Sequence, residues 1–129
     1  MTNREIIERF EAGTPPGDSF HHADHVQVGF AYVSEFPVLE AIAKFSAALQ
    51  RFAAKCGKPN LYHETITWAY LFLIRERMVR GGRAQSWEEF AAENSDLLIW
   101  SGGIVQRIYG KGILESETAR MNFVLPSNL

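Results

Sequence analysis

The stretch from Tyr62 to Gly82, with the sequence YHETITWAYLFLIRERMVRGG, decides the fold of this chain. Its middle, residues 66–74, is apolar on almost every side of a helix, whereas a surface helix usually carries one apolar stripe. Three arginines follow, which is typical of the C-terminal end of a helix with its partial negative charge, and a pair of glycines then ends the helix. We therefore predict a buried central helix near residues 63–80.

The remainder of the sequence indicates helices separated by short breaks and loops. Besides the central one, helices are predicted near residues 3–11, 22–36, 38–56, 86–94 and 116–124, with a further short one beginning at Asp96. Glycine and proline between residues 13 and 18 predict a loop there. The only weak sign of a strand is at residues 104–109. We expect an all-α fold, an irregular helical bundle of about five to seven helices.

Composition limits the class of protein. The chain has 129 residues, 47% of them hydrophobic, which predicts a single all-α domain over residues 1–129. A net charge of −2 without a charged run argues against nucleic-acid binding. The polar N-terminus lacks the pattern of a signal peptide and no apolar run is long enough for a bilayer, so we expect a soluble, cytoplasmic protein with no membrane association. The sequence is compatible with a homo-oligomer.

All four histidines lie in two short clusters. His21, His22 and His25 fall at the start of the second predicted helix, and His63 falls at the start of the central one. Two helices separated by a single antiparallel helix run parallel, so both starts should lie at one end of the bundle. Histidine titrates near neutrality and is the commonest metal ligand, and we therefore expect one functional pocket at that end.

One interpretation of the pocket is a metal site. His22, His25 and His63 would bind a divalent transition metal, with Asp24 or Glu64 as a fourth ligand or a hydrogen-bonding partner. The match to known zinc motifs is incomplete, because the second histidine of H-E-x-x-H is missing after Glu64.

A second interpretation needs no metal. Asp24 or Glu64 orients an imidazole, and His25 or His63 moves a proton, so the candidate catalytic residues are Asp24, His25 and His63. The residues expected to hold the ligand are His22, Tyr62, Thr65 and Thr67. Two helix N-termini directed at one pocket favour a small anionic molecule. The sequence specifies neither the substrate nor the reaction of such a small enzyme.

A third interpretation assigns the histidines no function. In a non-enzymatic interaction or structural module, they and Asp24 would only cap helices. An exposed apolar stripe on the second or the last helix would favour this alternative.

The two clusters also carry a family resemblance. Residues 20–25, FHHADH, and residues 62–67, YHETIT, follow the patterns F-x-H-x-D-H and Y-H-x-T-x-T. With these motifs the chain resembles an uncharacterised bacterial family of small all-helical proteins over about residues 20–80. The resemblance implies no activity. It marks His22, Asp24, His25, Tyr62, His63, Thr65 and Thr67, and it leaves His21 outside the pattern.

Overall fold

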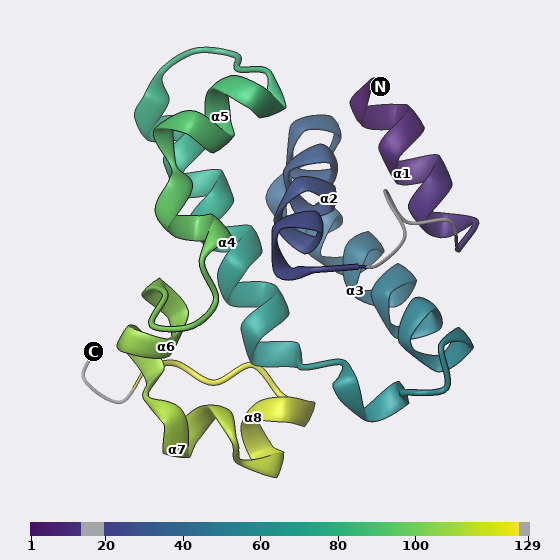
Figure 1. Cartoon of the computed structure of the whole chain (residues 1–129), viewed down its shortest axis with the longest axis vertical. Coiled ribbons are helices and arrows are strands. Elements are labelled where there is room, and N and C mark those ends of the chain that lie inside the picture. The colour runs from purple at the N-terminus through teal and green to yellow at the C-terminus, as the bar shows by residue number, and fades with distance from the viewer. Residues whose placement is uncertain (14–19, 127–129) are drawn as a thin grey trace.

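The computed structural model describes residues 1–13 and 20–126, and this part of the chain is helical throughout, without a strand (Figure 1). Its elements are α1 (Asn3–Glu11), α2 (His22–Glu35), α3 (Val38–Lys55), η1 (Pro59–Leu61), α4 (Glu64–Gly81), α5 (Trp87–Glu93), η2 (Ser95–Leu98), α6 (Ile104–Tyr109), α7 (Lys111–Leu114) and α8 (Glu117–Met121), where η marks a 3₁₀ turn. The predicted all-α bundle is confirmed. The predicted loop at residues 14–19 lies outside the described residues.

Helix α4 lies at the centre and packs against α2, α3, α6 and α8. Leu71 and Ile74 on its inner face are fully buried. Helix α2 packs tightly against α4 at Gly29, where an added Cβ would lie only 2.8 Å from Leu71 Cδ2 and 3.2 Å from Ile74 Cδ1. The glycine therefore permits close packing of the two helices. Phe72 is 38% exposed, so one side of α4 remains open.

Local signals place the ends of the four longest helices. His63 caps the start of α4, and Gly82, with φ of 71°, ends that helix in the left-handed conformation that favours glycine. Helices α1 and α2 also agree with their predicted ranges to within one residue. None of the described helices combines the length and the apolar character that a membrane span needs.

The C-terminal third differs most from the prediction. The weak strand signal at residues 104–109 is wrong, because this segment forms α6, and Val105 and Tyr109 are buried one helical turn apart. The helix predicted from Asp96 is limited to the 3₁₀ turn η2. With α6 and the short α7, the described part has eight α-helices, besides the two 3₁₀ turns.

The last predicted helix ends early, at Met121 rather than near Val124. The Thr65 hydroxyl on α4 donates a hydrogen bond to the Asn122 carbonyl at 2.6 Å and accepts one from the Val124 amide at 3.1 Å. These two bonds satisfy backbone groups that a longer helix would have paired internally. The chain after α8 is therefore extended against α4.

Candidate functional site

The two histidine clusters border one cavity, as the sequence predicts. Its volume is about 660 Å³, and it lies between the starts of α2 and α4 and the end of α3. Five of the predicted site residues line it: His22, His25, Tyr62, His63 and Thr67. Asp24 and Thr65 are not part of its wall.

Most of the remaining wall is apolar. Leu49, Phe52 and Ala53 come from α3, and the other apolar residues of the wall are Phe20, Leu61, Ile66 and Trp100. Leu49 and Phe52 belong to an apolar stripe that recurs at helical spacing along residues 38–56 of the sequence. Nothing in the sequence points to Trp100, which reaches the cavity from the loop after η2. Lys58 is the one charged side chain among the lining residues.

A smaller cavity of about 50 Å³ lies beside the large one. The two cavities share five lining residues, which are His22, His25, Leu49, Ile66 and Thr67. Tyr70 lines only the smaller of these two cavities, which we call the inner cavity. Tyr70 falls within residues 66–74, the apolar stretch that the sequence predicts as the middle of a buried helix, so the sequence does not mark it as a site residue.

His25 is the most deeply placed histidine. Burial lowers its pKa to about 4, and the neighbouring His22 acts in the same direction, against the opposing effect of Asp24. The Phe20 ring lies against the imidazole with 4.2 Å between ring centroids. None of the described residues forms a hydrogen bond with the His25 imidazole, whereas its backbone N–H donates to the His21 carbonyl at 3.1 Å. The ring is therefore neutral at pH 7, with both nitrogens available to a ligand.

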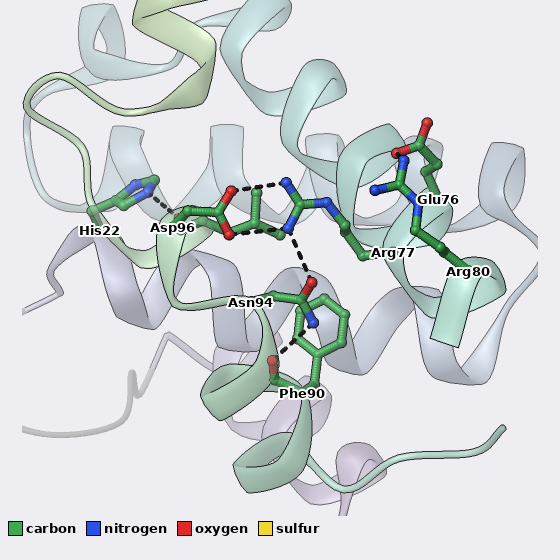
Figure 2. Close-up of polar contacts among 8 residues, drawn as sticks. His22, Glu76, Arg77, Arg80, Phe90, Asn94 and Asp96 are labelled. Carbon is green, nitrogen blue, oxygen red and sulfur yellow. Dashed lines mark hydrogen bonds and ion pairs between the residues drawn. The ribbon is translucent and has the colours of Figure 1, made fainter. Parts of the chain in front are cut away.

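His22 is held by a chain of contacts that begins on α4 (Figure 2). Arg77 Nη1 and Nη2 donate to the two carboxylate oxygens of Asp96 at 3.0 and 2.8 Å, which fixes the turn η2. The next carbonyl, that of Leu97, lies 2.9 Å from His22 Nε2. Because a carbonyl only accepts, Nε2 carries the proton and Nδ1 keeps its lone pair. Burial lowers the His22 pKa, although the Leu97 carbonyl opposes the shift.

His63 serves as a cap. Its Nδ1 accepts the backbone N–H of Ile66 at 3.1 Å, and its Nε2 lies 2.8 Å from the Leu114 carbonyl, to which it donates. Both nitrogens are therefore engaged within the protein. In this arrangement His63 has no lone pair for a metal and no free nitrogen for proton transfer. The catalytic and metal roles predicted for His63 are not supported, and the capping interpretation applies to this residue.

The metal site predicted from His22, His25 and His63 does not fit the structure. Over residues 1–13 and 20–126, no three side chains of histidine, cysteine, aspartate or glutamate are grouped so that they could hold an ion. Both ring nitrogens of His63 are hydrogen-bonded to backbone groups. A divalent transition metal therefore lacks the donor set that the sequence suggested.

The predicted acid–base partners are also directed elsewhere. Asp24 accepts the backbone N–H of His21 at 2.8 Å and lies 3.7 Å from the Nδ1 atom of the same residue, so it pairs with His21 at the start of α2 and not with the imidazoles that line the cavity. The Tyr62 hydroxyl donates to Glu64. Burial and this bond raise the Tyr62 pKa, so the phenol stays protonated at neutral pH. The described residues thus offer hydrogen-bonding groups around the cavity and not a matched acid and base.

The two threonines of the YHETIT motif have different roles, and a matched pair of variants should separate them. Thr65 is fully buried and holds the C-terminal segment through its hydroxyl, whereas Thr67 lines both cavities. Thr65→Val is expected to lower the free energy of unfolding by about 2 kcal/mol, because the Asn122 carbonyl and the Val124 amide lose their hydrogen-bond partner in a partly buried position. Thr67→Val is expected to change it by less than about 0.5 kcal/mol. Urea unfolding measures both, and equal costs would contradict this assignment.

No family model, curated protein or solved structure matches the chain. The resemblance to an uncharacterised bacterial family therefore stays a prediction.

Proposed function

We propose that the protein binds a small molecule with a largely apolar body in the cavity between α2, α3 and α4. The observation that carries the proposal is the wall itself, in which aromatic and aliphatic side chains surround a few polar groups contributed by His22, His25 and Thr67. Small-molecule sites are usually built this way, with volumes of roughly 300 to 1,000 Å³. The cavity of about 660 Å³ falls in that range.

Binding is favoured over proton transfer by the state of the histidines. With a pKa of about 4, His25 is a weak base at neutral pH. The ring nitrogens of His63 are both engaged by backbone groups. Lys58 is the only charged side chain among the described lining residues, and most of the wall is apolar, so the cavity favours a neutral ligand over an anionic one.

The alternative is an interaction or structural module in which the histidines only cap helices. His63 agrees with this alternative, because it caps α4. His22 and His25 do not act as caps, since they lie within α2, line the cavity and are not the N-cap residue. The large exposed hydrophobic side chains of the described residues include none on α2, so the apolar stripe expected of this alternative is absent there.

Filling the cavity should abolish binding. Ala53 lines it, while the neighbouring Ala54 points away and is exposed, so Ala53→Leu and Ala54→Leu form a matched pair. We expect NMR titration with small amphipathic probes, hexanamide and 2-heptanone among them, to shift amides around the cavity of the parent protein. Ala53→Leu should weaken binding at least tenfold, about 1.4 kcal/mol, and Ala54→Leu should leave it unchanged.

Two results would contradict the proposal. If no probe binds the parent, or if binding is insensitive to Ala53→Leu, the cavity is not a ligand site and the structural alternative gains support. Stoichiometric Zn²⁺ binding that is lost in both His22→Gln and His25→Gln would instead revive the metal interpretation.

A further inference from the structure

Two residues that line the inner cavity, Tyr70 and His25, carry polar groups without hydrogen-bond partners among the described residues. The hydroxyl of Tyr70 is buried without a partner among the described residues, and the Tyr70 side chain is only 6% exposed. The imidazole of His25 is likewise unbonded within this part of the chain and lines the same cavity of about 50 Å³. Buried polar groups in native proteins are nearly always paired, so an unpaired one points to a water or a ligand.

We propose that the inner cavity receives the uncharged end group of the ligand, a carbonyl oxygen that accepts a hydrogen bond from the Tyr70 hydroxyl beside the His25 ring. This inference rests on the proposed binding function and adds the chemical class of the ligand, which is a neutral amide, ketone or ester with an apolar body. It also assigns a binding role to Tyr70.

The Tyr70 hydroxyl is suited to donate a hydrogen bond to the ligand. Burial, with a further contribution from the charge of Asp96, raises its pKa to about 12, so the hydroxyl keeps its proton at neutral pH. The ring is also held in place. It meets the His22 ring edge-on at 4.8 Å between centroids, and His22 is itself fixed by the Leu97 carbonyl.

The lining of the inner cavity selects against charge. Its other residues are apolar apart from His22, His25 and Thr67, and neither an acidic nor a basic side chain other than these neutral imidazoles contributes to it. A carboxylate placed there would lose its hydration without a cation to replace it. A carbonyl oxygen needs only a donor, which Tyr70 supplies. The ligand's apolar body then remains in the large cavity against Phe52 and Trp100.

The size of the inner cavity admits one competing occupant. A water molecule needs about 10 to 15 Å³ of such volume, so a cavity of about 50 Å³ can hold water as well as a carbonyl group. Water alone would satisfy the Tyr70 hydroxyl and would make this cavity irrelevant to recognition.

Three probes with the same pentyl chain test the inference: hexanamide, 2-heptanone and hexanoate, which differ only in the group on the carbonyl carbon. We expect NMR titration at pH 7.5 to show hexanamide and 2-heptanone binding at least ten times more tightly than hexanoate. Tyr70→Phe, which removes only the hydroxyl, should weaken the binding of both neutral probes about tenfold. Tyr109→Phe is the control, since Tyr109 is equally buried and lies outside both cavities.

The His25 ring provides a readout that does not depend on the variants. Its ¹⁵N resonances should shift when 2-heptanone binds to the parent. Equal affinities for hexanoate and 2-heptanone, together with no effect of Tyr70→Phe, would overturn the carbonyl inference and show that water alone occupies the inner cavity. The proposed function would stand in that case if binding is still blocked by Ala53→Leu. Absence of binding by all three probes would overturn both.

Discussion

Replacing Leu71 with alanine is expected to lower the free energy of unfolding by about 3 to 5 kcal/mol. Leu71 is fully buried on α4, and its Cδ2 reaches the surface of α2 at Gly29. Because Gly29 has no side chain, nothing on α2 at that point can move in to fill the space that Leu71 leaves. The loss therefore includes both the transfer free energy of the removed isopropyl group and the cost of an unfilled cavity.

Urea unfolding at pH 7.5 measures this change, with Leu39→Ala as its control. Leu39 lies on α3 and is 71% exposed, so its truncation should change stability by less than about 0.5 kcal/mol. If Leu71→Ala costs no more than Leu39→Ala, α4 is not the centre of the core.

The second large effect is a loss of stability in acid that originates at His25. Its pKa is about 4 in the folded protein, against an ordinary value of 6.5. Between these values the unfolded chain binds a proton that the folded protein does not, so stability falls as the pH decreases through this window and is regained as the pH rises. Each pKa unit corresponds to about 1.4 kcal/mol, and the expected loss between pH 7 and pH 4 is roughly 3 kcal/mol. The lowered pKa of His22 adds to it in the same direction.

Urea unfolding at a series of pH values between 4 and 7.5 tests this origin. In His25→Gln the decrease in stability toward acid should be smaller than in the parent by roughly 2 to 3 kcal/mol. His21→Gln, at the exposed N-cap residue directly before α2, is the control for the same change of residue type outside the cavity. Parallel curves for the parent and His25→Gln would show that the imidazole is not desolvated in the folded state.

Much of the fold could be predicted because its signals are local. The apolar run on α4, the stripe on α3 and the glycines that follow them depend only on residues within a few turns of one another. Helix α6 was misread because six residues are too few to distinguish the spacing of a helix from that of a strand. The early end of α8 depends on Thr65, which is 57 residues away from the Asn122 carbonyl that it binds.

The candidate site could be predicted only in part, for the same reason. The positions of His22, His25 and His63 at two helix starts are enough to expect one pocket, and the structure places all three on a common wall. Hydrogen bonds to distant carbonyls decide which imidazole nitrogens can still bind a ligand. The Nε2 atom of His63 is bonded to the Leu114 carbonyl, and that of His22 is bonded to the Leu97 carbonyl. Every residue has a backbone carbonyl, so the residue types in the sequence do not indicate which carbonyls will bind the histidines.

The sequence by itself thus determined the central helix, the all-α class and the gathering of histidines at one end of the bundle. These features follow from hydrophobic periodicity and helix order, which depend on residues close together in the sequence. Only the tertiary structure decided the chemistry of that end. It buried His25 as a neutral ring, engaged both nitrogens of His63, separated Thr65 from Thr67 and left the Tyr70 hydroxyl unpaired beside the inner cavity. Desolvation and hydrogen bonding to distant backbone groups control these states, and both exist only after the chain has folded.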